Sequence, residues 1–304
     1  MKNWNEFPHD ASDYAFEGDA LEASWEDLHT GDKEPYPEDE ALADAWRAFH
    51  RGDFQQAVEL ADAVGIEGHA VANKATGIYA TYLEENSNRQ VGLFKEAIDR
   101  AEAAIDAFPD DANAHYFHAF NLGRYSQSIS IVKALSQGIG GKIQTSLQNA
   151  LNLEPAHAEA STAMGMYHAE IVSKVGKMLG KMTYGASPGK AIQCFDQSLE
   201  LTPGSPIAHI EYGNGLYLLY EDDRIDDVSD VYIKASELEP MDASGGGWEM
   251  ASPHPSKTAV DRRRHRRTPP PRRLRRRSHT PSRATLRRVS GSHWFAFAPS
   301  KSPP

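Results

Sequence analysis

Residues 191–203 read AIQCFDQSLELTP, and this stretch decides the fold because its pattern recurs along the chain. Residues 97–109 (AIDRAEAAIDAFP), 147–155 (LQNALNLEP) and 228–240 (VSDVYIKASELEP) repeat the same order of small and apolar residues before a proline. Intervals of 46, 48 and 37 residues separate the four closing prolines, Pro109, Pro155, Pro203 and Pro240. A repeat with a period in this range predicts helices stacked into an array.

Each recurring unit is expected to hold two antiparallel helices that touch through small residues. The candidates are Gly77, Ala119, Gly165 and Gly213 in the first helices, and Ala57, Ala97 and Ala191 in the second. The closing proline ends the second helix, because the residue before a proline avoids the helical conformation. The unit matches the tetratricopeptide repeat. We therefore predict an all-α solenoid of four to five antiparallel helix pairs over residues 38–243.

Two of the units are longer than this motif requires. The motif needs about 12 residues between the small positions of its two helices. The chain has 24 residues from Ala119 to Ile143 and 26 from Gly165 to Ala191. The extra segments carry apolar residues at helical spacing, Ile129, Val132, Leu135 and Ile139 in one and Ile171, Val175, Met178 and Met182 in the other. We expect elongated or inserted helices in the third and fourth pairs.

Residues 40–243 resemble the tetratricopeptide-repeat proteins of the regulator of microtubule dynamics family, as a bacterial-type member. The resemblance is densest in NLGRY (121–125), ALSQG (134–138) and the stretch from GMYH (165–168) to Ala191. It implies an all-α repeat domain without catalytic residues that acts through protein contacts. Eukaryotic members of the family are linked to microtubules and organelle membranes.

The repeat region lies between two segments of different character. Residues 1–37 form an acidic N-terminal extension with scattered aromatic residues, which is either a disordered arm or, as we favour, a segment docked on the repeats. Residues 244–304 form an Arg/Pro-rich tail whose composition forbids a packed core. That tail is a basic arm for nucleic acid, a partner for the chain's own acidic body, or a frame-shifted end, which the abrupt change after Ala243 favours.

Charge and composition restrict the class of protein. Within the 304 residues, residues 1–250 carry a net charge of −25 and residues 251–304 carry +14. The acidic body argues against tight binding of duplex nucleic acid, because phosphates repel it. A single cysteine, Cys194, excludes a disulfide framework. The chain shows neither a long apolar run nor a signal-peptide pattern, so we expect a cytoplasmic protein.

The candidate motifs for nucleotide binding, metal binding and catalysis lack either the required spacing or the required partner residues. GASPGKA (185–191) and GIGGK (138–142) depart from the phosphate-loop pattern and are interpreted as turns between helices. His115 and His118 lie three residues apart, but a metal site needs further ligands that the spacing does not supply. No elbow motif places a nucleophile. We therefore predict no catalytic residue, metal, cofactor or small-molecule substrate, and a protein that is not an enzyme.

The predicted function is that of a scaffold or adaptor, which binds a segment of a protein partner in the concave groove of the array. The repeat register places eight residues along or near this groove: Trp46, Phe49, Tyr116, Phe120, Arg124, Met166, Asn214 and Tyr217. Aromatic and arginine side chains are favoured anchors in interfaces. The alternative for these residues is packing against neighbouring helices or against the N-terminal extension.

Two other functions remain open. Residues 121–190 carry seven basic and three acidic residues inside an otherwise acidic body, and Lys174, Lys177 and Lys181 recur there at helical spacing. This basic patch is a docking surface for an acidic partner, or a membrane-surface tether through residues 171–182. The alternatives, which we favour, are a solvated face or a seat for the chain's own acidic N-terminus. Nucleic-acid binding would depend on the tail alone.

Overall fold

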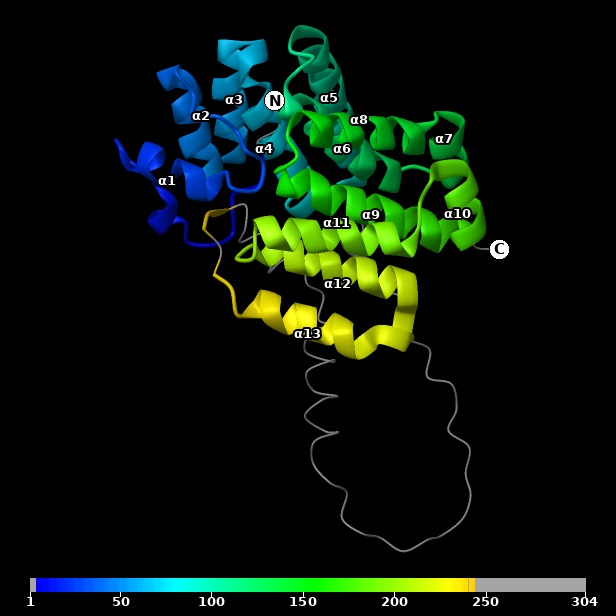
Figure 1. Ribbon diagram of the computed structural model, residues 1–304. Helices are drawn as coiled ribbons and strands as arrows, with labels where there is room; N and C mark the ends of the chain where they lie inside the picture. The colour runs from blue at the N-terminus through cyan, green and yellow to red at the C-terminus, as the bar shows by residue number, and fades with distance from the viewer. Residues whose placement is uncertain (1–3, 240, 244–304) are drawn as a thin grey trace, which may run out of the picture.

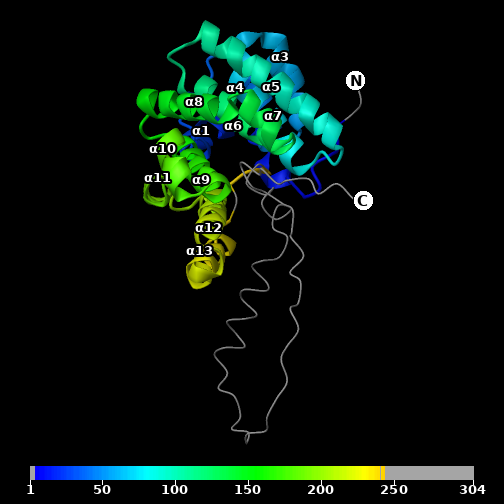
Figure 2. The ribbon, with the colours of Figure 1, turned by 90° about the vertical axis from the view of Figure 1, so that its right-hand side faces the viewer.

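The computed structural model describes residues 4–239 and 241–243. Within them the chain forms five antiparallel helix pairs. The pairs are α2 (Glu40–His50) with α3 (Phe54–Val64), α4 (His69–Tyr82) with α5 (Ser87–Ala107), α6 (Ala112–Gln127) with α8 (Ile139–Leu153), α9 (Ala158–Val175) with α11 (Pro188–Leu201), and α12 (Pro206–Tyr220) with α13 (Ile225–Ser236). Figure 2 shows α3 and α5 at one end of the stack and α12 and α13 at the other. The predicted all-α tetratricopeptide solenoid is confirmed.

Polar side chains cap the starts of several helices. The Asp111 carboxylate accepts hydrogen bonds from the backbone N–H groups of Asn113 and Ala114 at the start of α6. Ser187 and Ser205 cap α11 and α12 in the same way, each followed by a proline in the first turn. Such caps satisfy N–H groups that have no partner inside the helix, and a proline is tolerated there because its missing N–H is not needed.

Small residues allow the helices to approach closely, as the repeat pattern predicts. A Cβ atom added to Gly77 on α4 would lie 2.3 Å from the Phe120 ring on α6. One added to Gly165 on α9 would lie 2.8 Å from the Phe195 ring on α11. The second-helix alanines Ala57, Ala97 and Ala191 are fully buried. The predicted contact positions therefore hold residues small enough for a neighbouring helix to pack directly against the backbone.

The extra residues of the third and fourth pairs form two inserted helices. α7 (Ile131–Ser136) lies between α6 and α8, and α10 (Lys177–Tyr184) lies between α9 and α11. Figure 1 shows both at the same end of their pairs. The Gln144 side-chain amide on α8 donates to the Tyr184 carbonyl at 3.1 Å, which ties α10 to its neighbour. The predicted insertions are confirmed.

The apolar stripe expected across residues 171–182 is only partly buried. Gly176 adopts a φ of +84° and ends α9, so the stripe does not continue along one helix. Ile171 is buried, but Met178 and Met182 on α10 are each 78 % exposed. The apolar stripe is therefore divided between two helices, and its two methionines remain exposed. The side chains of Val132 and Leu135 lie outside the described part of the structure.

The N-terminal extension docks on the array, and its first residues pack on the first two helix pairs. The Trp4 ring stacks on Tyr79 with 4.0 Å between ring centroids, and Trp4 N–H donates to the Gln55 side chain. α1 (Ala20–Leu28) buries Leu21 and Trp25. The extension therefore carries its own share of the apolar core.

The last described residues return to the beginning of the array. After α13 the chain turns back toward α1 and α2, as Figure 1 shows. Asp242 Oδ2 lies 2.6 Å from Nδ1 of His50 at the end of α2, and Ala243 is fully buried. The predictions made for the Arg/Pro-rich tail, including nucleic-acid binding and a frame-shifted end, concern residues 244–304, which lie outside the described residues.

Candidate partner-binding surface

Six of the eight predicted groove residues are buried inside the fold. Trp46 and Phe49 on α2 lie beneath the extension, with Trp25 packed edge-on against Trp46 at 5.6 Å. Tyr116 on α6 lies 4.6 Å from the His157 ring, and Met166 is fully buried on α9. These side chains, together with Phe120 and Arg124, pack between helices instead of lining an open groove, because the first helices approach one another closely and the extension covers one end.

Arg124 is a buried charge with partners of several kinds. Its guanidinium lies 5.5 Å from the centroid of the Phe120 ring and 6.0 Å from that of Tyr82. One of its nitrogens is 3.9 Å from Glu211 Oε1 on α12. Arg124 therefore links the second, third and fifth helix pairs from within.

Asn214 and Tyr217 on α12 are the two predicted groove residues that remain accessible. The Asn214 side-chain oxygen accepts a hydrogen bond of 2.6 Å from the Tyr232 hydroxyl on α13, which holds the amide in place. The Tyr217 side chain is 46 % exposed. The open part of the predicted groove is thus confined to the end of the array that the extension does not cover.

The loop after α1 crosses the first helices of the second, third and fourth pairs, a contact that sequence reasoning missed. The Lys74 ammonium on α4 pairs with the Asp32 carboxylate of this loop and lies 3.0 Å from Glu159 Oε1 on α9. The backbone N–H of Glu159 donates to the Gly31 carbonyl at 3.0 Å. A polar loop of the extension is therefore held by side-chain and backbone groups of the array.

Asn113 at the start of α6 supplies the second contact to this loop. Its side-chain N–H groups donate to the Asp32 carbonyl at 3.1 Å and to Glu34 Oε2 at 2.6 Å. Its oxygen lies 3.0 Å from His157 Nε2, while His157 Nδ1 accepts from the Ala160 backbone N–H. Because Nδ1 accepts, Nε2 carries the hydrogen, and His157 fixes the orientation of the Asn113 amide.

The electrostatics of this loop follow from burial and pairing. Burial opposes the charge of Asp32, but Lys74 and His29 hold the pKa of that carboxyl well below its usual range. Burial, with the charges of Asp32 and Asp111, raises the pKa of Glu34 well above its usual value. Burial likewise lowers the pKa of His157. The Asp32 carboxylate therefore stays ionised, whereas Glu34 is held in place by its hydrogen bond with Asn113.

One sequence signal could have located this contact. Lys74 stands alone in the apolar stretch HAVANKATGIYA (69–80) of a first helix. A lysine surrounded by small and apolar residues needs a counter-charge when its helix packs, because a buried ammonium is costly without one. The partner, however, lies 42 residues earlier in the chain, and no local pattern points to it.

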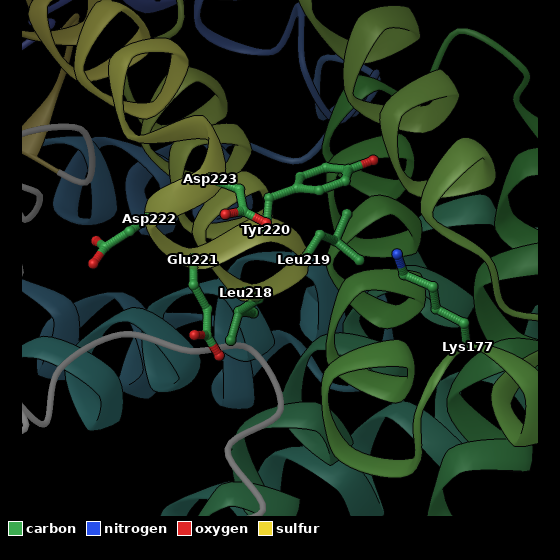
Figure 3. A pocket seen from close by; sticks show the side chains of 7 residues that line it. All are labelled: Lys177, Leu218, Leu219, Tyr220, Glu221, Asp222 and Asp223. Atoms are coloured by element: carbon green, nitrogen blue, oxygen red, sulfur yellow. The ribbon is translucent and has the colours of Figure 1, made fainter.

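The predicted basic patch is divided between two helices. Lys174 lies on α9 with its ammonium 4.0 Å from Glu170 Oε2, while Lys177 and Lys181 are exposed on α10. Leu179 is exposed beside them, as are Met178 and Met182. Figure 3 shows Lys177 extending toward the end of α12, where it borders an open hollow of about 300 Å³ with Leu218, Leu219, Tyr220 and residues 221–223.

The other predicted residues have structural partners. His115 Nε2 bonds the Pro109 carbonyl at 2.9 Å, and His118 Nδ1 bonds the Ser146 hydroxyl at 2.7 Å. Gly138 and Gly185 lie at helix ends in the left-handed conformation, as expected for turns. Burial raises the pKa of the Cys194 thiol to about 11.

Between residues 4 and 243, leaving out the undescribed position 240, His, Cys, Asp and Glu side chains do not gather in groups of three or more suited to a metal ion. In the same residues no helix has both the length and the apolar character needed to cross a bilayer.

Comparison with known proteins places the chain in a family. No curated protein is detectably similar to it in sequence. The crystal structure of MamA is 17 % identical, with a TM-score of 0.35 over 64 % of this chain and 92 % of that one. The model of the family described as regulator of microtubule dynamics protein 1-3 matches residues 56–212, just over half of the chain. The chain belongs to the regulator of microtubule dynamics protein 1-3 family.

Proposed function

We propose that the chain is a non-enzymatic cytoplasmic scaffold whose first helices bind a segment of a protein partner. The observation that carries this proposal is that the array already holds a stretch of polypeptide. The loop of residues 29–34 is bound through Lys74, Asn113 and the Glu159 backbone, which belong to three successive helix pairs. A surface that recognises one segment through side chains and backbone groups has the chemistry to recognise another.

The open end of the array is the proposed site for a partner from outside the chain. Tyr217 offers an exposed aromatic ring, and Asn214 beside it has its side-chain amide held by Tyr232. Aromatic side chains contribute large contact areas at little cost in conformational entropy, which favours Tyr217 as an anchor.

Site-specific photo-crosslinking tests this function. A benzoylphenylalanine residue replaces Tyr217 in one variant of the full chain, and exposed Gln148 on the second helix α8 in a matched control. We expect adducts to one protein partner from position 217 and none of that partner from position 148. Equal adducts from both positions, or adducts from neither, would contradict a partner site on the first helices.

A second function is favoured by one observation, the exposed face of α10. Met178, Leu179 and Met182 are exposed on the same short helix as Lys177 and Lys181, in an otherwise acidic protein. Apolar side chains flanked by lysines suit insertion into the headgroup region of an anionic bilayer. We propose this face as a membrane-surface contact that leaves the array free for a protein partner.

Vesicle sedimentation tests the α10 contact. The full chain is expected to sediment with phosphatidylcholine vesicles that contain phosphatidylserine, and not with phosphatidylcholine alone. Lys177→Glu/Lys181→Glu and Met178→Ser/Met182→Ser should each lose this binding. Lys95→Glu/Lys234→Glu, which makes the same charge change on exposed lysines of other helices, should keep it. Equal binding by the wild-type chain and all three variants would contradict a membrane contact through α10.

A further inference from the structure

Two buried histidines meet where the ends of the described chain come together. His29 follows α1, His50 ends α2, and their Nε2 atoms lie 3.3 Å apart. On its other side, His29 Nδ1 lies 2.9 Å from Asp32 Oδ1. The Nδ1 of His50 lies 2.6 Å from Asp242 Oδ2. Both rings are almost completely buried.

These three contacts determine the charge of the pair. A carboxylate only accepts hydrogen bonds, so each Nδ1 that faces one carries a hydrogen. The two Nε2 atoms then form a hydrogen bond only if one of them carries a hydrogen and the other does not. One imidazole is therefore protonated on both nitrogens, the other is neutral, and the pair holds a single positive charge.

We propose that His29 and His50 share this one proton and act as a histidine clasp that fastens the N-terminal extension and residues 241–243 to the array. The clasp joins segments 192 residues apart, because His50 binds Asp242 while His29 belongs to the extension. When it opens, the loop of residues 29–34 and the returning segment lose a shared anchor.

The groups around the clasp favour one proton over none or two. Asp32 and Asp242 face its two outer nitrogens, and both stabilise a positive charge on the pair. Lys74 pairs with Asp32 from α4 and opposes a second positive charge. Burial lowers the pKa of His50, which makes His50 the neutral member.

Aromatic rings shield the pair from water on several sides. Trp25 stacks on His29 at 4.0 Å, and Trp46 lies against both imidazoles. Phe16 and Phe49 pack edge-on against His50. If neither Nε2 carried a hydrogen, two nitrogen lone pairs would face each other in this water-excluded site. If both carried one, two N–H groups would face each other.

The closed clasp is therefore most stable at one intermediate pH and is less stable at higher and at lower pH. Two histidines in an unfolded segment hold about one proton between them near pH 6.5, the ordinary histidine pKa. At higher pH the closed state holds more protons than the open state, so closure is lost as the pH rises. At lower pH the closed state holds fewer, so closure is lost as the pH falls.

Hydrogen exchange of the full chain across the pH range tests this proposal. After correction for intrinsic exchange rates, peptides that cover residues 20–36 and 241–243 should be protected most at one intermediate pH. Their opening constants should rise together on either side of it, by up to about tenfold per pH unit. His50→Gln should abolish the maximum, while His115→Gln, a buried histidine bonded to a backbone carbonyl, should keep it.

Nitrogen-15 NMR of the wild-type imidazoles provides a measurement that does not depend on a variant folding. At the pH of greatest protection, the His29 and His50 signals should show one imidazolium and one neutral ring, or their average. Two neutral rings or two imidazolium rings would overturn the proposal. Protection that changes in one direction only with pH, or a maximum retained in His50→Gln, would do the same.

Discussion

Lys74 on α4 and Glu159 on α9 lie 3.0 Å apart, Nζ to Oε1, although 85 residues separate them in the chain. The same ammonium also pairs with Asp32 of the extension. The second and fourth helix pairs and the extension therefore meet at one buried cation. Its environment differs from that of Arg47, whose partners Glu40 and Asp44 are exposed.

Lys74→Met should destabilise the fold by about 3–5 kcal/mol, because it removes the ammonium that pairs with the buried Asp32 carboxylate and leaves only His29 beside it. Arg47→Met is the matched control and should cost at most about 1 kcal/mol, since exposed ion pairs contribute little. Urea denaturation of both variants measures the difference. Equal losses would show that Asp32 does not depend on Lys74.

Gly77→Ala should destabilise the array, because the new Cβ would lie 2.3 Å from the Phe120 ring at the contact between α4 and α6. Overpacking of this kind costs about 1–3 kcal/mol. Gly92→Ala on α5 is the control, since a Cβ there meets nothing within 4 Å. It should stabilise the helix by about 0.5–1 kcal/mol. Thermal melts of the two variants should therefore shift in opposite directions.

Lys33→Gly should stabilise the extension. Lys33 is exposed and has a φ of +55°, a conformation that costs a residue with a Cβ about 1–2 kcal/mol. Glycine removes most of that strain, against a smaller loss from its freer unfolded chain. We expect greater protection of residues 20–36 from hydrogen exchange. Lys95→Gly, an exposed lysine inside α5, should instead lower stability by about 1 kcal/mol.

Stability should fall as the pH drops below about 6.5, and His168 is one cause. Burial lowers the pKa of His168 to about 4, from the ordinary histidine value of about 6.5. Between these values the unfolded state binds more protons than the folded state, so acidification favours unfolding. The shift corresponds to about 3 kcal/mol once the pH reaches 4.

Chemical denaturation at several pH values measures this slope. His168→Gln should show a shallower loss of stability between pH 6.5 and pH 4, whatever its stability at neutral pH. His9→Gln, an exposed histidine of the extension, should keep the wild-type slope. An unchanged slope in His168→Gln would assign the acid sensitivity to other groups.

Much of the architecture was predictable because its causes are local. A proline ends a helix through its own ring, and a serine or aspartate cap acts on the next three residues. The glycine and alanine positions follow from the repeat, and Gly77 and Gly165 do lie against aromatic rings. The inserted helices α7 and α10 followed from counting residues between these positions.

The sequence pattern did not predict which faces of the helices are buried by other parts of the chain. The repeat register puts Trp46 and Tyr116 near the inner surface, but it contains no information about the extension that covers Trp46 or the His157 ring beside Tyr116. Helical spacing also placed Met178 and Met182 on one apolar stripe with Ile171 and Val175. The break at Gly176 turned their helix outward, and both remain exposed.

The sequence by itself therefore determined the class of fold, the repeat of helix pairs and the place of the inserted helices, since these depend on interactions between residues a few positions apart. Only the tertiary structure decided that Lys74 would meet Asp32 and that His50 would meet Asp242. Such contacts depend on how a stack of helices curves and on where its two ends return. The free energy of burying charges together selects these partners, and no periodicity in the chain records it.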